Sequence, residues 1–255
     1  MIFTSQYRDN LRSELIETAQ NDPRINGAAV TGSASVGKED RWSDIDLFFG
    51  IEETMLQQTL ADWTEMMYGK HDVVHHIDVI SRSTIYRVFL LRNTLQVDLA
   101  FSPSSEFGAR GSTFKLLFGD PVEEVHPTSK QTVEYLIGLG FIYALHVRAC
   151  IRREQWWRAE YFIRGVRDTI LNLACMKYNL PLPEARGIDS LPREVTAPLE
   201  KALVRELNAS EILRAFRATM NVFLIELQTI DVALSSRILE TLKDVVETTV
   251  AGVAP

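Results

Sequence analysis

Alternating apolar and polar residues mark short segments throughout the first half of the chain. Such alternation is typical of strands that bury one face. It predicts strands at residues 27–31, 44–51, 73–81, 86–91 and 95–101, the last two joined as a hairpin through Arg92 and Asn93. Apolar residues at helical spacing predict helices at 5–20 and 55–67. The first half is therefore predicted to be a mixed sheet with a few helices.

From about residue 128 the apolar residues follow a helical period. The predicted helices cover residues 129–152, 155–178, 193–207, 209–233 and 235–250. A loop with Pro and Gly occupies 181–192. Pro127 disfavours helix at the residue before it, so a domain boundary is expected within 126–129. The predicted fold class is α+β, with a mixed-sheet domain at 1–126 and an all-α helical bundle domain at 127–255.

The composition indicates a packed globular protein. Of the 255 residues, 46% are hydrophobic, which is enough for a core in one or two domains. There is no uninterrupted run of about 18 uncharged apolar residues, and the first segment becomes charged too early for a signal peptide. Cys150 and Cys175 lie among apolar residues of helical period, which favours packing over disulfide or metal chemistry. We expect a cytoplasmic protein without a membrane partner.

The charge of the chain bears on its partners. A formal net charge of -7 and a pI near 5.3 provide no overall basic surface for a phosphate backbone. Nucleic acid is therefore a disfavoured partner, and a cationic small molecule a favoured one. RNA stays an alternative partner because of one local group of basic residues, Arg148, Arg152, Arg153 and Arg158.

Two carboxylates stand close together at the start of the predicted strand 44–51. In a strand Asp44 and Asp46 share one face, while Ile45 and its apolar neighbours point to the other. Adjacent carboxylates repel each other unless a cation lies between them, and Mg²⁺ prefers such oxygen ligands. The alternative is a solvated strand start with both charges facing water.

The turn before this strand has small residues. At Gly32 the backbone can approach a ligand closely, and Ser33 offers a backbone N–H and a hydroxyl that suit a phosphate oxygen. Lys38 in the same loop is a further phosphate contact in this interpretation. An ordinary Gly-Ser turn with a solvated lysine is the alternative.

A third acid, Asp98, lies in an otherwise apolar predicted strand and needs a partner. If strand 95–102 pairs with strand 44–51, three aspartates converge into a site for two metal ions. Asp78 is a rival third carboxylate, but the residues around it indicate an exposed or edge strand. The histidines at 71, 75 and 76 lack a Cys or Glu at zinc-ligand spacing, so we do not predict zinc.

These residues together resemble a known superfamily. The order is a strand, Gly32-Ser33, a ten-residue gap, Asp44-Ile45-Asp46 on a second strand and Asp98 on a later one. It resembles the polymerase-beta-like nucleotidyltransferases. With the helical second half, the chain resembles the antibiotic nucleotidyltransferases, among them the kanamycin and lincosamide enzymes.

The resemblance implies roles for these positions. Gly32 and Ser33 would contact the phosphates of a nucleoside triphosphate, and Asp44 and Asp46 would bind Mg²⁺. Asp98 would bind the second of two metal ions, act as the general base, or both. The implied reaction moves a nucleoside monophosphate, most simply AMP from ATP, to a hydroxyl of a small molecule such as an aminoglycoside or lincosamide. The resemblance also makes a homodimer possible, because the cleft of related enzymes can be shared between subunits.

Candidates in the helical half lie on the segment 148–168. Glu160 and Arg164 are four residues apart, which fits either a surface ion pair or a cleft face. The resemblance implies a catalytic glutamate from the helical half, and we assign it to Glu160, with Arg164 or Arg167 meeting the triphosphate. Trp156 and Trp157 could stack on a ring of a ligand, although we expect at least one in the core.

Two alternatives to a small-molecule acceptor remain. One keeps the chemistry and changes the acceptor to a protein side chain or an RNA end. The other is a nucleotide-binding module that has lost catalysis, against which the three candidate aspartates argue.

Overall fold

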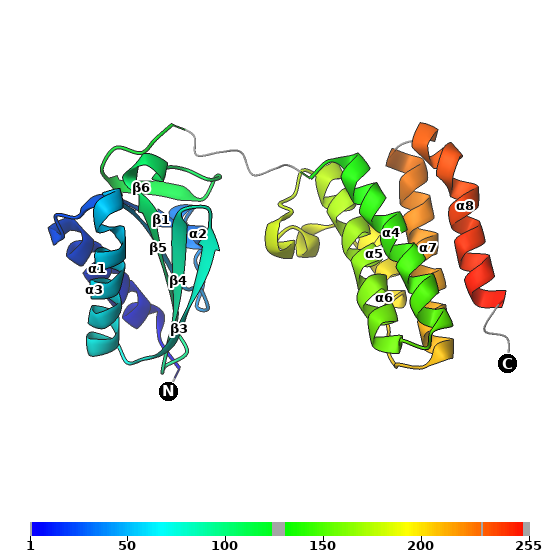
Figure 1. Cartoon of the computed structure of the whole chain (residues 1–255), viewed down its shortest axis with the longest axis horizontal. Helices are drawn as coiled ribbons and strands as arrows, with labels where there is room; N and C mark the ends of the chain where they lie inside the picture. Colours follow the sequence, from blue (N-terminus) through cyan, green and yellow to red (C-terminus); the bar gives the residue numbers. More distant parts are fainter. Residues whose placement is uncertain (1, 124–130, 231, 252–255) are drawn as a thin grey trace. The chain divides into compact units, whose positions relative to one another are not determined.

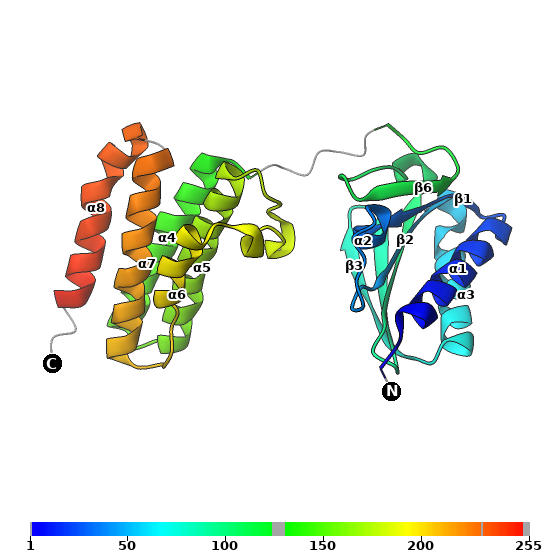
Figure 2. The same cartoon turned by 180° about the vertical axis from the view of Figure 1, so that it is seen from behind.

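A computed structural model describes residues 2–123, 131–230 and 232–251. The chain divides into two compact units, an N-terminal unit (Met1–Ser129) and a C-terminal unit (Lys130–Pro255). The predicted boundary at 126 lies outside the described residues and stays a prediction. Figures 1 and 2 label the helices and strands of each unit.

The N-terminal unit is a mixed six-stranded sheet with the strand order β3-β4-β5-β2-β1-β6. Its helices are α1 (Ser5–Asn21), the one-turn α2 (Gly32–Ser35) and α3 (Leu56–Lys70). The strands are β1 (Ile25–Thr31), β2 (Ile45–Ile51), β3 (Val73–Ser81), β4 (Thr84–Leu91), β5 (Gln96–Pro103) and β6 (Phe114–Phe118). β2 and β5 are parallel, and every other neighbouring pair is antiparallel.

Helices α1 and α3 cover one face of this sheet, here called the helix face (Figure 1). The reason is the alternation within the strands: Ile45, Leu47 and Phe49 of β2 point to the helices and are fully buried, at 1% exposure or less. Leu15 of α1 and Trp63 of α3 pack in the same core. The opposite face carries a smaller cluster of Ala29, Phe48, Ala100 and Phe107. This second face also carries the candidate site, and we call it the carboxylate face.

The C-terminal unit is all-α, as predicted. Its helices are α4 (Val133–Arg152), α5 (Trp156–Lys177), α6 (Arg193–Lys201), α7 (Ala209–Ile230) and α8 (Val232–Ala251). α5 packs against α4 and α7, and Cys150 and Cys175 are free thiols buried in the shared core, as predicted. Within the described residues, α4 alone is long and apolar enough to cross a membrane by length and composition. It contacts α5, α7 and α8.

The structure differs from the sequence prediction at three elements. β6 and α2 were not predicted, because neither has the length or alternation of a regular element. The helix predicted at 193–207 ends at Lys201. There the Arg214 guanidinium donates hydrogen bonds to the carbonyl oxygens of Lys201 and Leu203, and Asn208 begins the next helix by accepting from the N–H of Glu211. Hydrogen bonds from Arg214 to the carbonyl oxygens after α6 thus take the place of the helical turns predicted for residues 202–207.

Candidate metal and nucleotide site

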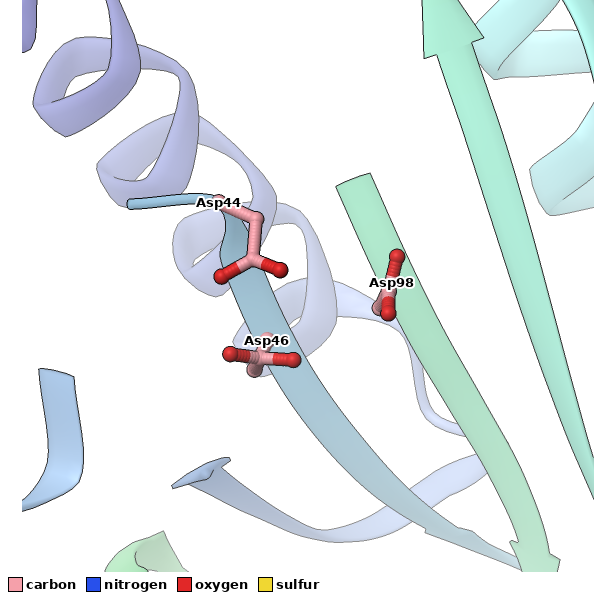
Figure 3. A group of neighbouring side chains, drawn as sticks. All are labelled: Asp44, Asp46 and Asp98. Atoms are coloured by element: carbon pink, nitrogen blue, oxygen red, sulfur yellow. The ribbon is translucent and has the colours of Figure 1, made fainter. Parts of the chain in front are cut away.

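The three predicted aspartates come together at the start of two neighbouring strands. β2 and β5 pair in parallel, which meets the condition set above for convergence, with Asp46 directly beside Asp98, and Asp44 immediately precedes β2. One carboxylate oxygen from each of the three lies within 4.8 Å of the others. All three side chains are half-buried. Figure 3 shows them near one another on the two neighbouring strands. The parallel register therefore brings Asp98 next to Asp44 and Asp46, although it is remote from them in sequence.

Gly32 borders this group from the neighbouring strand. β1 ends at Thr31, and Gly32 opens the short helix α2 with a φ of +61°, a left-handed conformation that favours glycine. A Cβ at this position would overlap the carboxylate of Asp46. Ser33 follows, half-buried, and its carbonyl accepts a hydrogen bond from the N–H of Lys38 at 3.0 Å. Gly32 is thus required by the backbone and by the space that Asp46 occupies.

A buried arginine anchors the loop that leads to Asp44. Arg8 of α1 is 4% exposed, and its Nη1 donates to the carbonyl oxygen of Asp40 at 2.6 Å and of Ser43 at 3.4 Å. Sequence reasoning did not identify Arg8, because a charged residue on an amphipathic helix is normally solvent-exposed. Its two acceptors hold the chain directly before Asp44, so Arg8 positions the first carboxylate indirectly.

The side chain of Gln96 lies beside two of the aspartates, Asp44 and Asp98. Its Nε2 donates to Asp98 Oδ2 at 3.1 Å and approaches Asp44 Oδ2 at 3.5 Å. The carboxamide therefore supplies a partial positive charge between two carboxylates that would otherwise repel. The alternation of the strand already placed Gln96 on the face of Asp98, but only the strand pairing brought it to Asp44.

Arg110 is the second functional-site neighbour that sequence reasoning missed. Its Nη1 donates to Tyr86 Oη at 2.9 Å and its Nη2 to Thr84 Oγ1 at 2.5 Å. The guanidinium lies 5.3 Å from the Phe48 ring centroid, and Phe48 follows Asp46 by two residues on the same face. Glu106 lies 4.0 Å away as a counter-charge. No local pattern in the loop around Arg110 signals this position, which depends on contacts with β2 and β4.

The rival carboxylate Asp78 lies on the opposite face. Arg87 on β4 binds it through two hydrogen bonds of 2.7 Å. These bonds hold the pKa of Asp78 below its ordinary value. Among the described residues, the aspartates 44, 46 and 98 form the one group of three or more acid, histidine or cysteine side chains with metal-binding spacing. The histidines at 71, 75 and 76 are not part of it.

The candidates from the helical half belong to the C-terminal unit. Glu160 lies half-buried in the second turn of α5. The ion pair considered between Glu160 and Arg164 is not formed in the described structure, because Arg164 Nε lies 3.4 Å from Asp168 Oδ2 instead. Trp156 packs against the core as expected for one of the pair, while Trp157 is 77% exposed. The roles of Glu160 and Arg164 stay predictions.

The donor set of the three aspartates fits Mg²⁺. This ion takes oxygen ligands at about 2.0–2.1 Å, so two ligands of one ion lie at most about 4.2 Å apart. The 4.8 Å limit within the group is close to that span, so small side-chain rotations would close it. Carboxylates are also the ligands of two-metal sites that act on phosphoryl groups.

Comparisons with known proteins complete the description. No family model matches this sequence, and no curated protein sequence matches it. Among solved structures, the chain is similar to an aminoglycoside 6-adenyltransferase from Bacillus subtilis, with 12% sequence identity and a TM-score of 0.40. The similarity covers 96% of this chain and 99% of that chain.

Proposed function

We propose that the protein is a Mg²⁺-dependent nucleotidyltransferase that moves a nucleoside monophosphate, most simply AMP from ATP, to a hydroxyl of a small molecule. The observation that carries the proposal is the convergence of Asp44, Asp46 and Asp98 from two parallel strands. An aminoglycoside or lincosamide antibiotic is the proposed acceptor class, and the cytoplasm the proposed location.

The aspartates would hold the metal ions, which when bound supply positive charge for the triphosphate and for the charge that develops at phosphorus. Gly32 and Ser33 begin α2 beside Asp46, where backbone N–H groups at a helix start suit phosphate oxygens. Lys38, anchored to Ser33 through its backbone, would add a positive charge at this end.

The reaction is an in-line displacement. The acceptor hydroxyl oxygen forms a bond to the α-phosphorus, while the bond from that phosphorus to the bridging oxygen of the β-phosphate breaks. Pyrophosphate leaves with the bond's electron pair. The hydroxyl proton passes to a carboxylate, for which Asp98 and Glu160 are the candidates, and from there to water.

The test is transfer of label from ATP labelled at the α-phosphate, with Mg²⁺ and a panel of hydroxyl-bearing antibiotics. We expect labelled product from the wild type and from Asp78→Asn, and none from Asp46→Asn. Asp78 is the matched control, since it is a strand aspartate on the other face of the same sheet. Equal labelling by wild type and Asp46→Asn would refute the proposal.

A further inference from the structure

The carboxylate face continues past Asp98 onto the β3–β4 hairpin. Strand pairing places Val88 beside Asp98 and Ile77 beside Val88, and residues paired across a sheet share a face. The next row places Tyr86 beside Ala100 and Val79 beside Tyr86, and on the other side Leu90 pairs with Gln96. We call the surface formed by Ile77, Val79, Tyr86, Val88 and Leu90 the hairpin platform.

The hairpin platform is mostly apolar. Its β3 side and Leu90 are solvent-exposed, whereas Tyr86 and Val88 are half-buried, and the exposed His75 pairs with Leu90 on the same face. Ile77 is 54% exposed, Val79 51% and Leu90 48%. The charged hairpin residues Asp78 and Arg87 alternate to the helix face, where they bind each other. A row of exposed aliphatic side chains beside a cluster of carboxylates is unusual on a protein surface unless it meets a ligand or a partner.

Charges of both signs border the platform, namely the Asp98 carboxylate beside Val88 and the Arg110 guanidinium beside Tyr86. Arg110 donates to the hydroxyl of Tyr86 and lies 5.9 Å from the centroid of its ring. Its counter-ion is Glu106, whose Oε2 lies 4.0 Å from Arg110 Nη2. The platform therefore offers mainly hydrophobic contact, with charges of both signs at its border, which suits an uncharged apolar surface.

The order of strands puts the residues expected to bind the leaving pyrophosphate and the hairpin platform on opposite sides of the aspartates. Gly32 and Ser33 follow β1, on the side of β2 away from β5, whereas β4 lies on the far side of β5. In an in-line displacement the leaving and attacking oxygens lie on opposite sides of the phosphorus. Pyrophosphate beside Gly32 and Ser33 thus leaves the attacking hydroxyl on the side of Asp98 and the hairpin platform.

We infer that the hairpin platform binds the acceptor, and that the acceptor carries an apolar alkyl or ring surface next to its reactive hydroxyl. This inference rests on the proposed function. It narrows the proposed acceptor class to amphipathic hydroxyl compounds, in preference to acceptors whose surface consists of ammonium and hydroxyl groups. A compound of the second kind would bury no apolar area on Ile77 and Val79.

The test compares the wild type with Ile77→Ser plus Val79→Ser in the full chain. Ile80→Ser is the matched control, because Ile80 is 69% exposed on the same strand but lies one residue further on, facing the other way. The acceptors are methyl, butyl and hexyl glucosides, lincosamides and aminoglycosides. Binding of a nonhydrolysable ATP analogue with Mg²⁺ is measured separately by calorimetry.

We expect the double variant to raise the KM of amphipathic acceptors at least tenfold, with the Kd of the ATP analogue within twofold of the wild-type value. Ile80→Ser should change neither. The wild type should use hexyl glucoside or lincosamides at least tenfold more efficiently than aminoglycosides.

Three outcomes would overturn the inference. Unchanged acceptor KM in the double variant, with normal ATP-analogue binding, removes the platform from acceptor binding while leaving the proposed function intact. A changed molecular mass by light scattering with unchanged acceptor kinetics would make the platform an interface between copies. Wild-type protein that binds no ATP analogue with Mg²⁺ would refute the proposed function itself, and the acceptor inference with it.

Discussion

The two faces of the N-terminal sheet are built from the same strands but differ in whether their carboxylates are paired with a cationic side chain. On the helix face, the aspartate at 78 is paired with Arg87 through two hydrogen bonds. On the carboxylate face, Asp46 and Asp98 lie side by side with Asp44 beside them. The first arrangement is neutral as it stands. The second gathers like charges, which costs stability and is explained by binding a cation.

All four residues are aspartates, so residue type does not distinguish the one that stabilises the fold from the three that form the candidate site. Their partners do. Both kinds are aspartates in or next to strands of one sheet; Asp78 is exposed, and the three on the carboxylate face are half-buried. The difference lies in the partner: an arginine on the adjacent strand in one case, and further carboxylates with a carboxamide, Gln96, in the other. Substitutions on the two faces should therefore have opposite signatures, with activity lost on one and stability lost on the other.

The largest effect is expected for Asp46→Asn combined with Asp98→Asn. Loss of metal-held charge at the reacting phosphorus should lower kcat/KM for nucleotide transfer by about a thousandfold or more, since this charge is worth several kcal/mol. The melting temperature without divalent ions should not fall, because two repelling charges are removed. Mg²⁺ should raise the melting temperature of the wild type only. A wild-type response to Mg²⁺ in the double variant would place the cation elsewhere.

The next effect concerns Gly32→Ala, with Gly37→Ala as control. Both glycines have a positive φ, +61° and +66°, so alanine strains the backbone at each. Only at Gly32 would the new methyl group overlap the Asp46 carboxylate, while no atom lies within 4 Å of a Cβ at Gly37. We expect about a hundredfold loss of transfer for Gly32→Ala and less than about threefold for Gly37→Ala. Equal losses would show that strain alone is responsible.

A smaller effect, on stability, is expected for Arg8→Met. It leaves the carbonyl oxygens of Asp40 and Ser43 without their buried donor and should cost about 2 kcal/mol of unfolding free energy. Arg12→Met, one turn further along α1, removes ion pairs with Asp9 at 3.1 Å and with Glu39 but leaves no backbone carbonyl without its donor, so it should cost less, about 1 kcal/mol. Urea denaturation measures both. Similar costs for the two variants would contradict the anchoring role of Arg8.

The smallest effect is expected for Asp78→Asn and depends on pH. Because Arg87 lowers the folded-state pKa of Asp78, the ion pair contributes stability above the unfolded-state value near 3.8. That contribution is lost as the pH falls through the lowered folded-state pKa. At pH 7 the variant should be less stable by about 0.5–1 kcal/mol, because the pair is partly exposed. A difference that persists at the lowest pH values would mean that packing, not charge, is responsible.

The sequence predicted most regular elements because their signals are local. Neighbouring residues alone produce the alternation in β2, β3 and β5. They also produce the helical spacing in α1, α4, α5 and α7. The prediction was wrong where distant residues decide. Arg214 ends α6 early from another helix, and β6 is a strand because it pairs with β1.

The sequence by itself determined the alternating strands, the helical second half, and the identity and faces of Asp44, Asp46 and Asp98 as candidates. Tertiary structure alone decided the parallel pairing of β2 with β5 and the pairing of Asp78 with Arg87, whereas the sequence already favoured Asp98 over Asp78. It also decided the space that Gly32 leaves for Asp46 and the apolar surface beside Asp98. The physical reason is that strand periodicity fixes which face a side chain takes, whereas its neighbours on that face come from hydrogen-bonded strands remote in sequence.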